Sequence, residues 1–130
     1  MSRPVMVDSS WYIDQARQGI DPLQELALAA VDRDIAVCGL IAAEVGRGMR
    51  QRKFLDRYLR AWSQMLYIPS TRQRWQETME LAWQLDRIGR VLPLQDLHIA
   101  ACALHIGSVV LSTDAHFKDI PGISMVREIY

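Results

Sequence analysis

The hydrophobic positions of the chain fall into short continuous runs, separated by longer segments in which apolar residues recur at helical spacing. Residues 4–8, 35–38 and 108–111 are such runs, and they are typical of strands buried on both faces. Residues 67–69 and 123–126 are expected to form two further short strands. The pattern predicts a sheet whose strands alternate with helices.

The helical segments are delimited by residues that favour helix starts and stops. Ser9 or Ser10 can cap a first helix that stops at Gly19. Further helices are expected at residues 21–33, 40–49, 52–66, 70–89 and 94–104, with a turn of helix at 115–119. Short buried strands alternating with helices indicate a parallel sheet covered on both faces. We therefore expect an α/β fold with three α/β/α layers.

Two helices carry apolar stripes. Within residues 52–66, an apolar face is predicted from Leu55, Leu59, Trp62 and Leu66. A second stripe, defined here as the Trp stripe, consists of Trp75, Met79 and Trp83 at steps of four. Core packing accounts for Trp62, but four Trp and six Met in a small chain leave apolar surface over. This surplus predicts a homodimer interface or a groove for a partner helix.

Length and composition are those of one globular domain. The chain has 130 residues, of which 50% are apolar and 23% charged, so we expect a single domain over residues 1–130. No apolar run approaches the ~20 residues of a membrane span, and the opening segment is too short for a signal peptide. A cytoplasmic protein without a membrane partner is expected. Cys38 and Cys102 lie inside apolar runs and are interpreted as small buried hydrophobic residues.

Four acidic residues stand where the predicted strands end. Asp8 closes the first strand, Asp114 follows the strand at 108–111, and Glu44 lies in the helix after the second strand. Asp96 lies in the first turn of its helix, where an acid also stabilises the helix by itself. The carboxyl ends of parallel strands meet at one edge of a sheet. These four residues, called the acid site below, are therefore expected to converge.

Clustered carboxylates need a positive partner. Two unit charges ~5 Å apart repel by about 3 kcal/mol at an effective dielectric constant near 20. Arg47 is the only local base at helical spacing from one of these acids. A divalent cation is the natural counter-charge, and oxygen ligands without a converging His or Cys favour Mg²⁺ or Mn²⁺ over zinc.

The three histidines are not expected to be metal ligands. His98 and His105 are about 10 Å apart along one helix, too far to share a metal, and they are predicted at the surface or in an interface. His116, beside Asp114, is expected either to contact substrate or to stabilise a local turn.

The segments around the four acids resemble the acidic motifs of PIN domains, most closely those of VapC-type toxin ribonucleases from bacterial toxin–antitoxin pairs. The matching segments are Val-Asp-Ser-Ser-Trp at 7–11, Ala-Ala-Glu-Val at 42–45, Leu-Gln-Asp-Leu-His-Ile-Ala-Ala-Cys-Ala-Leu at 94–104 and Leu-Ser-Thr-Asp-Ala-His-Phe at 111–117. The third and fourth segments are the most specific. The resemblance extends over nearly the whole chain, from the first predicted strand to the last.

This resemblance implies a function and a set of roles. Asp8, Glu44, Asp96 and Asp114 would be the catalytic residues and would hold Mg²⁺ or Mn²⁺. Ser9 or Ser10 would assist Asp8, and Ser112 stands where the family often has Thr. The chain would be a metal-dependent endoribonuclease that cleaves RNA with a metal-activated water. It would be the toxin of a type II pair, and a small antitoxin would cover the acid site.

Charge is unevenly distributed along the chain. The net charge is zero, with 15 basic and 15 acidic residues, yet residues 47–74 hold eight bases and one acid. Clustered Arg suits the phosphates of RNA, and a solvated basic face or a partner site is the alternative. The candidates for phosphate contacts, called the basic segment below, are Arg47, Arg50, Lys53 and Arg57.

Two other classes of protein remain open. A receiver-type phospho-acceptor module also places acids at strand ends, but it carries paired acids after the first strand, where this chain has Asp8 alone. A non-catalytic RNA-binding domain of PIN shape is the second alternative, and the intact set of four acids argues against it.

Overall fold

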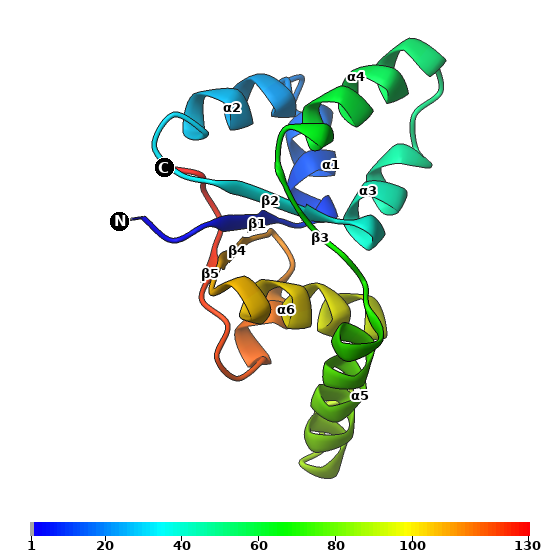
Figure 1. Ribbon diagram of the computed structural model, residues 1–130, viewed down its shortest axis with the longest axis vertical. Coiled ribbons are helices and arrows are strands. Elements are labelled where there is room, and N and C mark those ends of the chain that lie inside the picture. The colour runs from blue at the N-terminus through cyan, green and yellow to red at the C-terminus, as the bar shows by residue number, and fades with distance from the viewer. Residues whose placement is uncertain (1) are drawn as a thin grey trace.

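The computed structural model describes residues 2–130 and is built around a five-stranded parallel sheet (Figure 1). The strands are β1 (Val5–Val7), β2 (Ile35–Cys38), β3 (Leu66–Ile68), β4 (Val109–Leu111) and β5 (Met125–Val126). Their order is β3-β2-β1-β4-β5, so the chain moves outward from β1 to β3 and then returns to the other side of β1. The strand order reverses between β1 and β4, which is where parallel sheets bind ligands.

Helices cover both faces of this sheet. They are α1 (Ser9–Arg17), α2 (Pro22–Ala29), α3 (Gly39–Gly46), α4 (Arg52–Ser63), α5 (Arg72–Arg87) and α6 (Leu94–Ile106), followed by the short 3₁₀ helix η1 (Ala115–Asp119). In Figure 1, α1 to α4 lie above the sheet, whereas α5 and α6 lie below it. The expected three-layer α/β/α architecture is confirmed.

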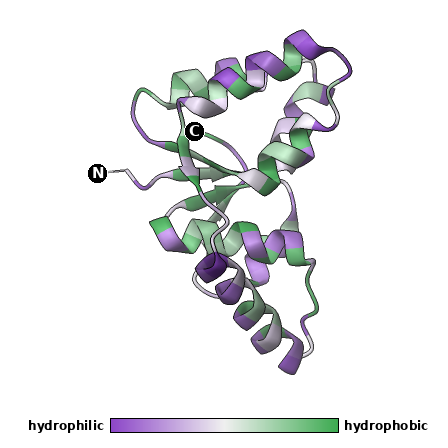
Figure 2. Cartoon of the chain, turned by 45° about the vertical axis from the view of Figure 1, so that its right-hand side comes forward, coloured by the Kyte–Doolittle hydropathy of each residue, from purple (hydrophilic) through white to green (hydrophobic). Residues whose placement is uncertain are grey.

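The central strands are apolar throughout because both of their faces are covered. Val5, Met6 and Val7 of β1 are at most 1% exposed. Cys38 at the end of β2 and Cys102 in α6 are also buried, and neither forms a disulfide. Both cysteines therefore act as small core residues, as predicted. Figure 2 shows the strands largely in green, the colour of hydrophobic residues, between helices of mixed colour.

Helix ends differ from the prediction in small ways. Asp8, and not Ser9 or Ser10, caps α1, and its carboxylate accepts a bond from the backbone N–H of Ser10. The helix α3 ends at Gly46, earlier than expected, so Arg50 lies in the connection to α4. Gly107 ends α6 in the left-handed conformation with φ of 63°, which glycine adopts without strain.

The predicted buried face of α4 is wrong in part. Leu59 is 48% exposed, and Leu66 belongs to β3, where it is also exposed. The buried side chains of α4 are Tyr58 and Trp62, which pack edge-on or tilted against Tyr12 of α1. Trp62 also donates a hydrogen bond to the Tyr12 hydroxyl at 3.3 Å. A cluster of three aromatic rings, and not a leucine stripe, fixes α4 over the sheet.

His98 is fully buried, so the prediction of a surface position is wrong. Thr78 donates its hydroxyl proton to a carbonyl one turn earlier in α5 and must accept from Nδ1 of His98, 2.9 Å away. Nε2 then accepts from the Ser70 hydroxyl at 2.8 Å, and the Trp75 ring stacks on the imidazole. Burial lowers the pKa of His98, which favours this neutral form. His98 therefore joins α5 to α6.

Among residues 2–130, no helix has the length and apolar character needed to cross a lipid bilayer.

Candidate active site

The four predicted acids lie at the carboxyl edge of the sheet. Val7 pairs with Leu111, and the Asp8 backbone N–H donates to the Leu111 carbonyl at 2.9 Å, so Asp8 and the β4–η1 connection lie side by side. Asp114 caps η1 in that connection. Glu44 lies on α3 directly after β2, and Asp96 lies in the first turn of α6. Four separate elements thus bring one carboxylate each to the same edge.

Asp8 is buried and held by two serines. Its Oδ2 accepts hydrogen bonds from the hydroxyls of Ser10 at 2.6 Å and Ser112 at 3.0 Å. These hydroxyls in turn accept from the backbone N–H groups of Thr113 and Asp114. Within residues 2–130 no hydrogen bond reaches Oδ1 of Asp8, so that oxygen is open to a further partner. The serines fix the carboxylate and tie it to the loop that carries Asp114.

Ser9 contacts Glu44 and not Asp8. Its hydroxyl donates to Oε1 of Glu44 at 3.4 Å, while Ser10 bonds to Asp8. The sequence left open which of the two serines assists Asp8. The geometry assigns that contact to Ser10 and links Ser9 to Glu44.

The surroundings of Glu44 and Asp96 raise the pKa of each. Burial raises the pKa of Glu44, and the charges of Asp8 and Asp96 add to this effect. Burial likewise raises the pKa of Asp96, with further contributions from the charges of Asp114 and Asp8, while a hydrogen bond from His116 opposes the shift. The four groups therefore form one electrostatic unit that a cation would stabilise.

His116 is the basic residue that contacts the acid site. The expectation that no histidine converges on these acids is therefore wrong. Its Nδ1 lies 2.8 Å from Oδ2 of Asp96 and 3.2 Å from Oδ1 of Asp114. The hydrogen bond to Asp96 is the largest cause that raises the pKa of His116. Arg47, the base expected from helical spacing, is exposed beyond the end of α3. The Asp114-Ala-His116 spacing at the start of η1 is the sequence signal for this contact.

The donor atoms suit a divalent cation. One ligand atom from each of Asp96, Asp114 and His116 lies within 4.8 Å of the others. Asp8 is outside this group of three but contributes a buried carboxylate to the same edge. Carboxylate oxygens are the preferred ligands of Mg²⁺ and Mn²⁺. The residues present therefore fit such an ion.

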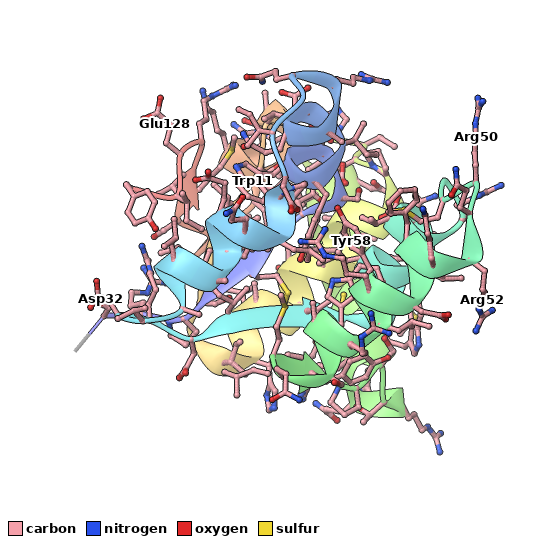
Figure 3. All side chains as sticks on the ribbon, turned by 90° about the horizontal axis from the view of Figure 1, so that it is seen from above. Trp11, Asp32, Arg50, Arg52, Tyr58 and Glu128 are labelled. Atoms are coloured by element: carbon pink, nitrogen blue, oxygen red, sulfur yellow. The ribbon has the colours of Figure 1, made fainter. Side chains whose placement is uncertain are left out.

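The basic segment lies on the α3–α4 side of the molecule. Figure 3 shows Arg50 and Arg52 extending outward at one edge, with Asp32 at the opposite edge. Arg57 is already paired, because its guanidinium donates two hydrogen bonds to the carboxylate of Asp21, at 2.6 and 3.2 Å. Of the four bases predicted to contact phosphate, Arg57 is thus the least available.

A cavity of about 500 Å³ lies away from the acids, lined by residues of α2, α4 and the starts of β2 and β3, among them Leu26, Ile35 and Met65. It is at the amino edge of the sheet, whereas the acid site is at the carboxyl edge.

The family model of the PIN domain matches residues 5–123. The chain therefore belongs to the PIN domain family, which removes the receiver-type alternative. A search of curated proteins found no match.

Solved structures with the same fold include components of toxin–antitoxin complexes. A chain of VapBC2 from Rickettsia felis, crystallised with a DNA fragment from its promoter, aligns with a TM-score of 0.76 at 20% identity, over 95% of this chain and 97% of that one. DNA-bound VapBC from Salmonella typhimurium gives a TM-score of 0.74 at 21% identity, over 97% and 98%. VapC20 of Mycobacterium tuberculosis, described as a Sarcin-Ricin loop cleaving toxin, gives 0.64 at 13% identity, over 92% and 98%.

Proposed function

We propose that this PIN domain is a divalent-metal-dependent endoribonuclease and the VapC-type toxin of a type II toxin–antitoxin pair. The observation that carries the proposal is the convergence of Asp8, Glu44, Asp96 and Asp114 at the carboxyl edge of the sheet. The likeness to VapC20, a Sarcin-Ricin loop cleaving toxin, supports the choice of RNA as substrate. We propose that the protein acts in the cytoplasm.

The side chains of the acid site have separate tasks in this proposal. When bound, Mg²⁺ or Mn²⁺ supplies an acidified water and neutralises charge on the scissile phosphate. Asp8, Asp96, Asp114 and Glu44 would hold the ion. Ser10 and Ser112 keep Asp8 in one orientation, and Ser9 does the same for Glu44. His116 orients the Asp96 and Asp114 carboxylates, since its Nδ1 lies between them.

The purified protein is expected to cut RNA in the presence of Mg²⁺ or Mn²⁺ and not in excess EDTA. The products should be followed on a denaturing gel, with metal added back after EDTA as the control for irreversible damage. Full activity in EDTA would contradict the proposal. Binding of RNA without cleavage under every metal condition would favour the remaining alternative, a non-catalytic RNA-binding PIN domain.

A small antitoxin is proposed as the protein partner that covers the acid site. The structural likeness to chains of VapBC complexes supports this choice. The product of an adjoining gene, if it encodes such a protein, should co-purify with the chain and suppress RNA cleavage. A ribonuclease that this product neither binds nor inhibits would contradict the assignment. A homodimer is part of the same proposal.

The basic segment is proposed to contact RNA phosphates. Arg47 and Arg50 are exposed between α3 and α4, near the end of the helix that carries Glu44. Replacing both with Gln should flatten the salt dependence of RNA binding by about 1.4 in the log–log slope, at about 0.7 per contact to a single strand. Affinity should fall to a similar extent for all sequences, because phosphate contacts position RNA and do not specify its sequence.

The matched control is the double variant Arg17→Gln and Arg90→Gln, which removes the same charge from exposed positions outside the basic segment. Its slope should stay close to that of the wild type. If the Arg47 and Arg50 double variant keeps the wild-type slope, as the control should, then these side chains do not contact RNA phosphates. The basic segment would then face solvent or bind a protein partner.

A further inference from the structure

Most exposed aromatic rings of the described chain are already engaged or lie far from the acid site. Five aromatic side chains within residues 2–130 are exposed: Phe54, Tyr67, Trp75, Trp83 and Tyr130. The Trp75 ring stacks on a buried imidazole, and a Lys or Arg side chain lies over the rings of Phe54 and Trp83. Tyr130 ends the chain, and in Figure 1 this end lies on the left, where the strands begin. Tyr67 remains as an exposed ring without such a partner among the described residues.

Tyr67 lies in the edge strand β3, and its ring reaches the carboxyl edge of the sheet. It pairs with Val37 of β2 and is 56% exposed. Its phenol oxygen lies over Gly39, where a Cβ would be 2.8 Å from it, so a larger residue at position 39 would push the ring away. Gly39 is the first residue of α3. The ring therefore ends at the start of the helix that carries Glu44.

Segments that carry two of the four acids flank Tyr67. Glu44 follows Gly39 by five residues, which is about 7.5 Å along α3. On the other side, Ser70 hydrogen-bonds to the histidine of α6 that stands two residues after Asp96. Successive phosphates of one nucleic-acid strand are about 3.4 Å apart along a helix axis. A base a few nucleotides away from a phosphate at the acid site can therefore reach the ring.

Helix α3 joins this ring to the basic segment. Arg47 directly follows the last residue of α3, about 12 Å from the start of the helix. Contacts of Arg47 and Arg50 with phosphates would hold RNA without contacting its bases. An aromatic ring supplies the missing contact, because the π face of any base can stack on it. A single strand laid along α3 would meet the ring, the carboxylates and the arginines in turn.

We propose that Tyr67 is a substrate-binding residue whose ring stacks on one base of single-stranded RNA beside the acid site. The inference rests on the proposed function, which supplies RNA as the substrate, and adds a base contact to the phosphate contacts. Unpaired bases are commonly recognised by stacking on aromatic side chains. The bases of a duplex are stacked on one another and are not free for this contact. The ring therefore favours unpaired segments of RNA.

The first test changes the ring in an Asp96→Asn background, which is expected to bind RNA without cutting it. Dissociation constants for labelled oligouridine are measured by fluorescence anisotropy. Adding Tyr67→Leu keeps an apolar side chain but removes the aromatic face, so it should raise the dissociation constant roughly tenfold. Tyr67→Phe keeps the ring and should stay within about twofold of the background. Tyr130→Leu, the matched control at the other exposed tyrosine, should bind as the background does.

The second test removes the bases from the RNA. An abasic oligomer of the same length keeps the phosphates of oligouridine, so contacts with the basic segment are retained. The Asp96→Asn protein should bind oligouridine about tenfold more tightly than the abasic oligomer. With Tyr67→Leu added, this preference should fall to about twofold or less, because no ring is left to meet a base. Such coupling between the ring and the base measures their direct interaction.

Four results would overturn the inference. They are unchanged oligouridine binding by Tyr67→Leu, a Tyr67→Phe variant as weak as Tyr67→Leu, an equal loss in Tyr130→Leu, and equal affinity of the background protein for both oligomers. Urea unfolding should show that each variant is folded.

The inference and the proposed function can fail separately. If the wild type cuts RNA while Tyr67→Leu leaves binding unchanged, the inference alone fails. If the chain binds RNA through Tyr67 but cuts none with any metal, the ribonuclease proposal alone fails. A wild-type chain that neither binds nor cuts RNA would overturn both.

Discussion

Asp96→Asn is expected to reduce RNA cleavage by roughly a hundredfold to a thousandfold while the fold is retained. Loss of a charged ligand removes several kcal/mol of the charge stabilisation that a bound metal gives to the transition state. The amide keeps the size of Asp96, and its oxygen can still accept from His116. Removing one of four clustered negative charges also relieves repulsion, so the thermal midpoint should stay the same or rise. RNA affinity should hold or increase.

The matched control for this variant is Asp32→Asn, at an exposed carboxylate that precedes β2 and so lies at the amino edge of the sheet. Cleavage rates, RNA dissociation constants and melting curves should be measured for both variants. Asp32→Asn should cleave RNA at the wild-type rate. An Asp96→Asn variant that also keeps the wild-type rate would show that the acids are not the catalytic groups.

Phe117→Ala is expected to lower the free energy of unfolding by about 3–5 kcal/mol, a large part of the ~5–15 kcal/mol of a typical domain. Phe117 is fully buried and lies in η1, directly after His116. Truncation to Ala leaves a cavity that the surrounding core fills only in part. Because Asp114 caps η1, the variant should also bind metal more weakly. Urea denaturation followed by circular dichroism measures the loss in stability.

Lys118→Ala is the control for this substitution, since Lys118 is the exposed neighbour of Phe117 in the same 3₁₀ helix. Surface changes of this kind usually stay within about 0.5 kcal/mol. A loss below 1 kcal/mol in Phe117→Ala would mean that the core does not anchor the loop that carries Asp114 and His116.

Much of the fold was predictable because the local pattern and the final environment agree. The strand predicted at residues 35–38 matches β2, since a strand covered on both faces needs an unbroken apolar run and Gly39 then begins the next helix. The helix predicted at residues 94–104 matches most of α6, which Gly107 ends because its left-handed conformation suits glycine.

The errors concern contacts made across the chain. Helical spacing in α4 allows several faces, and Tyr12 of α1 selects the one with Tyr58 and Trp62. His98 looks like a solvated residue in sequence, because Ser70, Thr78 and Trp75, which surround it, come from the preceding segment. Neither the buried face of α4 nor the burial of His98 can be predicted from the local sequence pattern.

The same distinction applies to the candidate site. The acids were identifiable because the carboxyl ends of parallel strands converge, and Asp8 and Asp114 follow adjacent strands. The contacts of His116 depend on the turn at η1, which brings its ring back between Asp96 and Asp114. The sequence shows that His116 is close to Asp114, but it does not show the contact of His116 with Asp96.

The most direct test of the central claim, that these carboxylates form a divalent-metal site, is Mn²⁺ binding measured by electron paramagnetic resonance of the purified chain without RNA. The wild type is expected to remove free Mn²⁺ from solution at a saturable site, and Mg²⁺ should compete for this site. Asp96→Asn and Asp8→Asn should each weaken binding, whereas Asp32→Asn should bind as the wild type does. A wild-type chain that binds no Mn²⁺, or acid-site variants that bind it with unchanged affinity, would show that these carboxylates are not a metal site.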